Sequence, residues 1–252
     1  MIFIRRAASR HRTQRRRQDV WHTFHSDNVH QAFAGGFGTL ETLDEDSVPP
    51  GATVVPRHAP GDAEIVTYVR EGAIAFEDST GHSGVLNAGE FQCLTTGYRV
   101  RHTETNASRT EWAQILQLRF RPSSVGRERA REQKRFSAAE RRSGLCVVAA
   151  PDARRGALRL HQDAMMYSAI LDPGQHIVHE LPVGRCAWLH LVRGQITVSA
   201  EVVLTAGDGA GICGEPSVSF TADVPSEVLL VDVFEPADFV NSPLDAAQVS
   251  MI

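Results

Sequence analysis

A repeated β unit constrains the fold of this chain more than any other feature of its sequence. Val66–Ala75 reads as an apolar strand, a glycine turn and a second apolar strand, and Leu189–Val198 repeats that pattern. Each copy is followed by alanine, glycine and an acidic residue, which are Glu90 in the first copy and Asp208 in the second. Two copies of one supersecondary unit predict two similar domains.

Short β-branched, aromatic and aliphatic runs separated by glycine turns recur along the chain, which is typical of β-sandwiches and barrels. One helical stretch is expected at Arg127–Arg142, where Phe136 is a lone apolar anchor among charged residues, as in a surface connector. The sequence therefore predicts an all-β fold with a short helical connector. The expected strands are Ile65–Arg70, Ala73–Glu77, Gly89–Leu94, Trp112–Phe120, Met166–Leu171, Ala187–Val192, Gln195–Ala200, Val218–Ala222 and Val228–Phe234.

The domain boundary is expected between Phe120 and Gly144, where charge rises and the strand alternation stops. The predicted divisions are a first domain at residues 1–122, a charged connector at 123–144, a second domain at 145–240 and a tail at 241–252.

The start of the chain is basic, although the formal net charge is −4. Aromatic residues are not interleaved with these arginines, and no nucleic-acid-binding motif accompanies them. Because Lys134 is the only lysine, the bias towards arginine extends over the whole chain. We therefore do not expect nucleic acid as a partner. The arginines concerned are Arg5, Arg6, Arg10, Arg12, Arg15, Arg16 and Arg17.

Cysteine usage and the first residues bear on the cellular setting. The cysteines are far apart and form no C-x-x-C pair, so we expect a reducing, cytoplasmic environment. Residues 1–4 are apolar but two arginines follow at once, so we expect neither export nor a membrane anchor. The four cysteines are Cys93, Cys146, Cys186 and Cys213.

One group of residues in the first repeat could carry chemistry. His102 and Glu104 lie two residues apart on a predicted strand, so their side chains share one face and can point into a barrel. His58 precedes the first repeat and can join them from a neighbouring strand. Two imidazoles and one carboxylate around a point are the ligand set of a non-haem iron site.

The motifs around these residues resemble the cupin motifs of the pirin family, and the resemblance covers nearly the whole chain. It implies two cupin-type jelly-roll β-barrels packed as a bicupin. The matching segments are Gly51–Gly72, Asp78–Gly81, Ala88–Gln92, His102–Asn106, Arg5–Ala7, Trp21–Phe24, Gly36–Gly38 and His161–Ala164.

The resemblance also implies a metal site in the N-terminal barrel, held by a His-x-His and a His-x-Glu motif. His58, His102 and Glu104 match three of the four ligands, whereas the fourth position is Pro60, whose side chain has no donor atom. The expected cofactor is Fe(II) or another divalent transition metal. The second repeat has no histidine near Phe220, where a ligand would recur, so we expect the C-terminal barrel to be degenerate.

The activity implied by the resemblance is dioxygenation of a flavonol-like, small aromatic substrate, as in quercetin 2,3-dioxygenase. Glu104 would then act both as ligand and as catalytic proton acceptor. Pro60 favours an alternative, a degenerate cupin that binds a small ligand or a regulatory protein partner without catalysis. We expect a monomer with a small aromatic ligand and no membrane partner.

Overall fold

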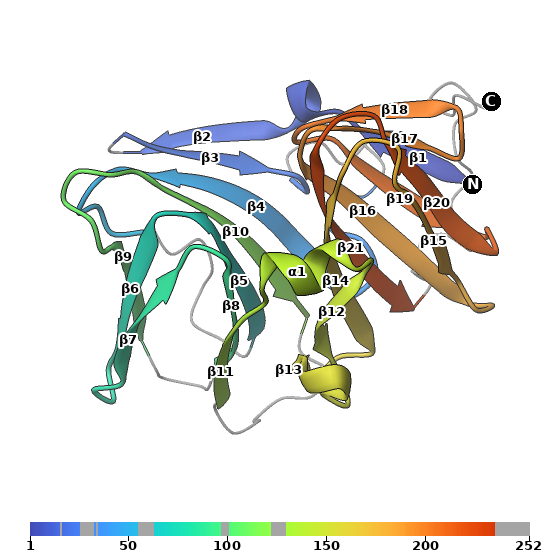
Figure 1. Ribbon diagram of the computed structural model, residues 1–252. Coiled ribbons are helices and arrows are strands. Elements are labelled where there is room, and N and C mark those ends of the chain that lie inside the picture. Colours follow the sequence, from blue (N-terminus) through green and yellow to red (C-terminus); the bar gives the residue numbers. More distant parts are fainter. Residues whose placement is uncertain are drawn as a thin grey trace.

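Two β-barrels lie side by side in the computed structural model (Figure 1). Within the described residues there are two seven-stranded sheets, one four-stranded sheet and one three-stranded sheet. Apolar side chains join each large sheet to one small sheet. The predicted all-β class with two barrels is confirmed. The structure describes residues 1–15, 17–25, 33, 35–54, 63–96, 101–121 and 130–234.

The N-terminal barrel contains a large sheet in the order β11-β8-β5-β10-β4-β3-β2 and a small sheet in the order β7-β6-β9. Its strands are β2 (His11–Arg15), β3 (Gln18–His22), β4 (Leu40–Val48), β5 (Ala63–Glu71), β6 (Ala73–Asp78), β7 (Ser83–Asn87), β8 (Glu90–Thr96), β9 (His102–Asn106), β10 (Ala113–Phe120) and β11 (Ala130–Arg135).

The C-terminal barrel contains a large sheet in the order β1-β19-β16-β21-β14-β12-β13 and a small sheet in the order β15-β20-β17-β18. Its strands are β1 (Ile2–Arg5), β12 (Cys146–Ala150), β13 (Leu158–Arg159), β14 (Ala164–Leu171), β15 (His176–Glu180), β16 (Arg185–Arg193), β17 (Gln195–Val198), β18 (Val202–Thr205), β19 (Gly209–Cys213), β20 (Ser217–Ala222) and β21 (Ser226–Phe234). The described residues also include two 3-10 turns, Ala7–Ser9 and Arg154–Gly156.

The first strand, β1, belongs to the C-terminal barrel, although the strands that follow it in sequence belong to the N-terminal barrel. It pairs antiparallel with β19, with Ile2 opposite Ile212 and Arg5 opposite Gly209. The chain then crosses to the N-terminal barrel, where β2 and β3 extend the large sheet (Figure 1). Residues 2–5, which the sequence places in the first domain, thus cover an edge of the second sheet.

The helix predicted at Arg127–Arg142 is wrong for much of its described part. Ala130–Arg135 is strand β11, which pairs with β8, and only Ala138–Arg142 forms the α-helix α1. Pairing with β8 decides the conformation of a charged run whose own preference is weak. Ser137 then begins α1 through a capping box with Glu140. In the described part of the chain no helix is long and apolar enough to cross a membrane.

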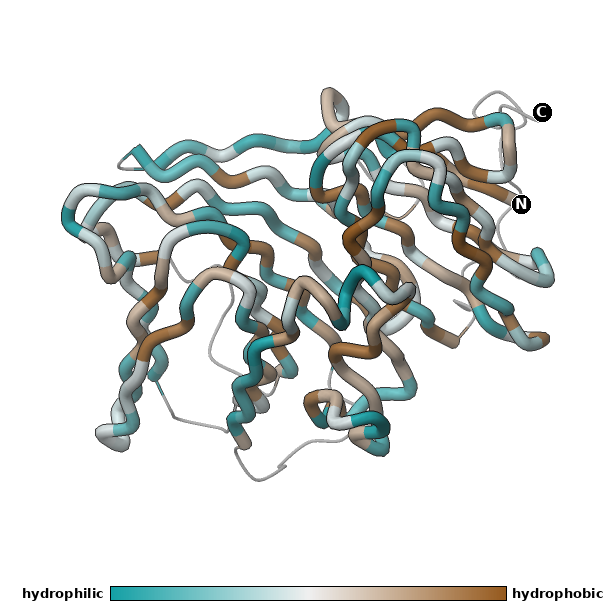
Figure 2. Tube along the Cα trace, in the orientation of Figure 1, coloured by the Kyte–Doolittle hydropathy of each residue, from teal (hydrophilic) through white to brown (hydrophobic). Residues whose placement is uncertain are grey.

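The two large sheets pack against each other through a shared apolar core. Leu118 and Phe91 from the first sheet and Trp188 and Val231 from the second are all buried in it. Hydrophobic and hydrophilic residues alternate along many of these strands (Figure 2), because successive side chains point to opposite faces. One face of each large sheet therefore lies between the barrels and the other faces a barrel interior.

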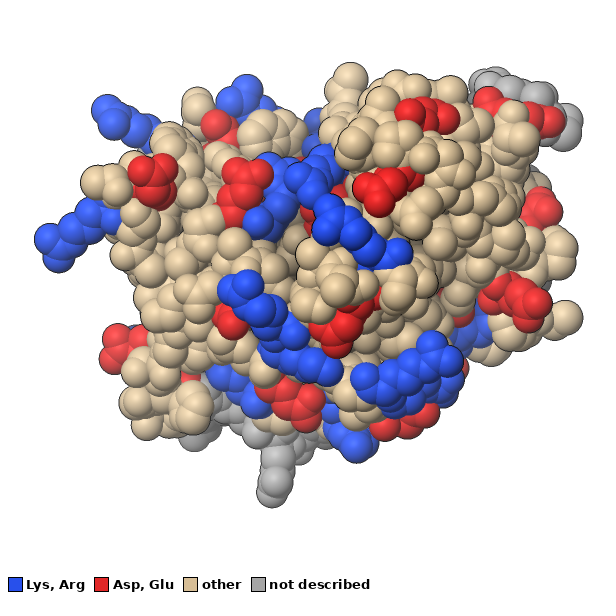
Figure 3. Space-filling model, viewed as in Figure 1, with Lys and Arg blue, Asp and Glu red and all other residues tan. Residues whose placement is uncertain are grey.

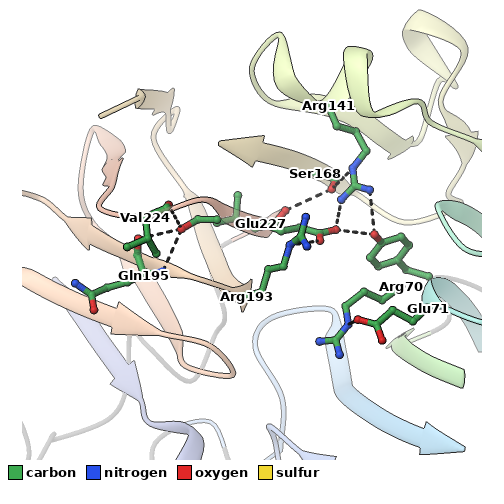
Figure 4. Close-up of polar contacts among 11 residues, drawn as sticks. Arg70, Glu71, Arg141, Ser168, Arg193, Gln195, Val224 and Glu227 are labelled. Carbon is green, nitrogen blue, oxygen red and sulfur yellow. Dashed lines mark hydrogen bonds and ion pairs between the residues drawn. The ribbon is translucent and has the colours of Figure 1, made fainter. Parts of the chain in front are cut away.

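A buried ion pair links both barrels to α1 (Figure 4). Arg141 of α1 pairs with Glu227 of β21 and donates to the Tyr68 hydroxyl of β5 at 3.0 Å and to Ser168 Oγ of β14 at 3.0 Å. The Tyr68 hydroxyl donates to Glu227 Oε1 at 2.6 Å. Burial raises the pKa of the Tyr68 hydroxyl, and the neighbouring Glu227 carboxylate raises it further, so Tyr68 stays a neutral donor.

A second buried cluster joins the barrels at Glu45 of β4. Glu45 Oε1 lies 2.6 Å from Arg10 Nη1 and 2.8 Å from Nε2 of His190 in β16. Burial alone raises the pKa of Glu45, but the hydrogen bonds and charges of His190 and Arg10 outweigh it and lower the pKa to about 2. The carboxylate therefore stays charged between the barrels.

Three of the arginines at the start of the chain pair with acidic groups of the protein itself. Besides Arg10, Arg6 pairs with Asp208 at 2.9 Å and Arg12 pairs with Asp19 at 2.7 Å. On the face shown in Figure 3, Lys and Arg side chains are interspersed with Asp and Glu.

Cys186 of β16 and Cys213 of β19 form a disulfide, although no short cysteine spacing announces one. The two residues lie 27 positions apart but directly opposite each other in the strand register. Cys93 and Cys146 are free. This disulfide depends on which residues the strand register places opposite each other. The absence of a C-x-x-C motif therefore does not exclude it.

We predict that Glu227→Gln lowers the free energy of unfolding by about 3–5 kcal/mol, because it leaves the buried Arg141 guanidinium without its carboxylate. Asp19→Asn, which breaks the more exposed pair with Arg12, should cost about 1 kcal/mol or less. Urea unfolding of both variants measures the difference. Equal losses would show that the buried pair does not stabilise the contact between the barrels.

We predict that Glu45→Gln flattens the dependence of stability on pH. A lowered pKa means that the Glu45 carboxylate stabilises the fold fully above about pH 4.5 and loses this effect as the pH falls towards 2. At pH 7 the variant should be less stable by about 3 kcal/mol. Urea titrations between pH 2 and pH 7 test this, and parallel curves for wild type and variant would contradict it.

Candidate metal site in the N-terminal barrel

Strand β9 brings two of the predicted site residues together. It pairs with β6 so that Glu104 lies opposite Phe76. Glu104 is buried while Thr103 is exposed, as the alternation of a strand requires. His102 Nε2 lies 3.0 Å from Glu104 Oε1. The two side chains therefore share the inward face of the strand and touch.

The third predicted ligand, His58, and the position of the missing fourth, Pro60, lie outside the described residues. Among the residues that the structure does describe, no group of three or more His, Cys, Asp or Glu side chains is arranged to hold a metal ion. His102 and Glu104 thus form a pair of candidate ligands.

The spacing of this pair fits adjacent ligands of one ion. Metal–ligand bonds of about 2.1 Å at right angles place neighbouring donor atoms about 3.0 Å apart. His102 Nε2 and Glu104 Oε1 are 3.0 Å apart. Imidazole and carboxylate with further positions open are the donors of facial-triad sites for transition metals. The described residues therefore suit part of such a site.

Polar side chains in register across the large sheet form the surface that faces Glu104. Gln117 of β10 lies opposite both Asp44 of β4 and Thr67 of β5, and Thr67 lies opposite Gln92 of β8. Gln117 Nε2 donates to Glu104 Oε2 at 2.6 Å. One oxygen of the carboxylate is thus fixed by the large sheet while the other faces His102.

The Arg131 guanidinium contacts the His102 ring at Nδ1, whereas Glu104 contacts it at Nε2. Arg131 of β11 places Nη2 2.9 Å from His102 Nδ1 and donates through Nη1 to Gln92 Oε1 at 2.9 Å. Its guanidinium carbon lies 3.9 Å from the centroid of the Phe76 ring. Gln92 is 1% exposed, and its Nε2 has no hydrogen-bond partner among the described residues.

Sequence reasoning missed Gln92, Gln117 and Arg131. Gln92 and Gln117 interrupt predicted apolar strands, and a polar residue at a buried strand position is a usable signal for a polar barrel interior. Arg131 carried no such signal because it fell in the predicted helix. Its position follows from the pairing of β11 with β8.

The interior of the C-terminal barrel is largely apolar. Leu189, Leu230 and Phe220 pack there with other buried aliphatic side chains. His179 is on the edge strand β15, and its Nε2 lies 3.0 Å from Oδ2 of Asp232, a buried residue on the same face of β21 as Leu230. The polar residues around Glu104 line part of the N-terminal barrel, whose interior also holds the apolar cluster that joins its two sheets.

We predict that Gln117→Glu destabilises the protein by about 3 kcal/mol at pH 7, because it replaces the donor to Glu104 by a second buried carboxylate. The loss should shrink as the pH falls from 7 towards 4, because the two adjacent carboxylates raise the pKa of one of them and that group then binds a proton. Gln114→Glu on the same strand, where Gln114 donates to Ser47, is the control and should cost about 1 kcal/mol. Equal urea midpoints for the two variants would contradict the contact.

Two family models together match most of the chain. The Pirin model matches residues 5–119, and the quercetinase C-terminal cupin domain matches residues 147–233. A quercetin 2,3-dioxygenase of Escherichia coli is 36% identical over 233 residues, which are 92% of this chain and 99% of that protein. A pirin-like protein of Caulobacter vibrioides is 34% identical over 199 residues, which cover 78% of this chain and 84% of that protein.

The fold also matches a solved structure of a family member. The bacterial pirin YhhW from Escherichia coli in complex with nickel(II) aligns with a TM-score of 0.84 and 34% identity, covering 93% of this chain and 100% of that one. The resemblance drawn from the motifs is confirmed. Since both barrels are matched and a relative shares 36% identity over 92% of the chain, this protein belongs to the pirin family of bicupins.

Proposed function

We propose that this protein is a metal-dependent dioxygenase of the quercetin 2,3-dioxygenase type. The observation that carries the proposal is the pair formed by His102 and Glu104, whose donor atoms lie 3.0 Å apart inside a polar barrel. His58 is the proposed third ligand. Relatives that carry the name quercetin 2,3-dioxygenase, and the nickel(II) in the YhhW structure, support the proposal.

A divalent ion such as Fe(II) or nickel held by these residues would supply a Lewis acid for a hydroxyl oxygen of the substrate. Glu104 is the proposed acceptor of the hydroxyl proton. Gln117 would keep the Glu104 carboxylate oriented through its 2.6 Å hydrogen bond. The Phe76 ring lies near His102, with 6.5 Å between ring centroids, and the Arg131 guanidinium covers one of its faces.

Elemental analysis and oxygen uptake test the proposal. Protein purified without chelator should hold about one transition-metal ion per chain and consume oxygen with quercetin. His102→Ala and Glu104→Gln should lose at least tenfold in metal affinity and activity. His82→Ala is the control, because that side chain is exposed in a turn. Protein free of iron, nickel, copper and manganese that does not turn over quercetin would refute the proposal.

A non-catalytic binding protein is the second candidate, favoured by the guanidinium of Arg131 beside His102. A substitution at Pro60 distinguishes this candidate from the metal-dependent dioxygenase. For a protein that binds no metal, Pro60→His should create nickel binding measurable by calorimetry. Stoichiometric metal in the wild type would exclude this candidate.

A further inference from the structure

The contact between Arg131 and His102 fixes the tautomer of the imidazole. A guanidinium group carries N–H donors and no acceptor. His102 Nδ1, 2.9 Å from Arg131 Nη2, must therefore accept the hydrogen bond. A neutral imidazole has a single N–H group, so its hydrogen lies on Nε2, which donates to Glu104 Oε1 at 3.0 Å.

This tautomer conflicts with metal binding. An ion bound to Nε2 needs the lone pair of that nitrogen, so the hydrogen must move to Nδ1. There it would face the N–H of Arg131 at a distance of 2.9 Å. In metal sites the second nitrogen of a ligating histidine usually donates to a carboxylate, a carbonyl or water. Here a cationic donor occupies the place of that acceptor.

Arg131 is held in this place by its own contacts. Gln92 accepts from Nη1, and the guanidinium stacks 3.9 Å from the Phe76 centroid. The chain Arg131, His102 and Glu104 also balances charge, because a cation and a carboxylate lie on either side of one neutral imidazole.

We propose that Arg131 sets the metal affinity of the N-terminal barrel. It holds His102 in the tautomer with hydrogen on Nε2, and an ion binds only when the guanidinium leaves His102 Nδ1. Arg131 is a positioning residue, since it acts through His102. This inference deepens the proposed function and rests on the proposed metal site.

Calorimetric titration with Ni²⁺ tests the inference without measuring activity. Arg131→Gln removes the cation and offers an amide oxygen as acceptor, so we expect it to bind Ni²⁺ at least tenfold more tightly than the wild type. Arg135→Gln, on the same strand with its side chain 59% exposed, makes the same charge change and should bind within twofold of the wild type. Equal or weaker binding by Arg131→Gln would overturn the inference.

Imidazole ¹⁵N spectra of the metal-free wild type give a second test, and its result does not depend on whether an Arg131 variant folds. The His102 signals, identified by their loss in His102→Gln, should show hydrogen on Nε2 and none on Nδ1. The opposite tautomer would overturn the inference. If the wild type binds Ni²⁺ and Arg131→Gln gains nothing, only the inference fails. If neither protein binds Ni²⁺, the proposed metal site fails with it.

Discussion

The packing of one seven-stranded sheet against the other determines the arrangement of the rest of the molecule. Tyr68 points into the shared core between the barrels, and Thr67 beside it must therefore point into the N-terminal barrel. The same alternation aligns Gln92 and Gln117 with Thr67 across three strands. A register slip of one residue would exchange the polar and apolar faces, so the contact between the barrels also fixes the polar interior.

The two barrels show how one architecture supports different interiors. In the C-terminal barrel Leu189, Phe220 and Leu230 fill the space that polar groups occupy in the other. In the N-terminal barrel Glu104 stays buried because Gln117 and His102 satisfy its oxygens. Fold alone therefore does not assign chemistry to a barrel, and the proposed chemistry depends on these few side chains.

Local sequence patterns predicted what depends on local geometry. The repeat around two glycine turns predicted two similar domains, and the two-residue spacing of His102 and Glu104 predicted that they share a face, as the 3.0 Å contact shows. Features set by pairing between distant strands escaped prediction. Arg131 reaches His102 only because β11 joins β8, and Cys186 meets Cys213 only through the register of β16 and β19.

The placement of β1 has a consequence for how the protein folds during synthesis. Ile2 is made 210 residues before its partner Ile212. At roughly 5–20 residues per second this strand waits on the order of 10–40 s for its place in the sheet. Until then its backbone donors and acceptors remain unpaired with β19, so the large sheet of the second barrel is completed only after β19 has been made.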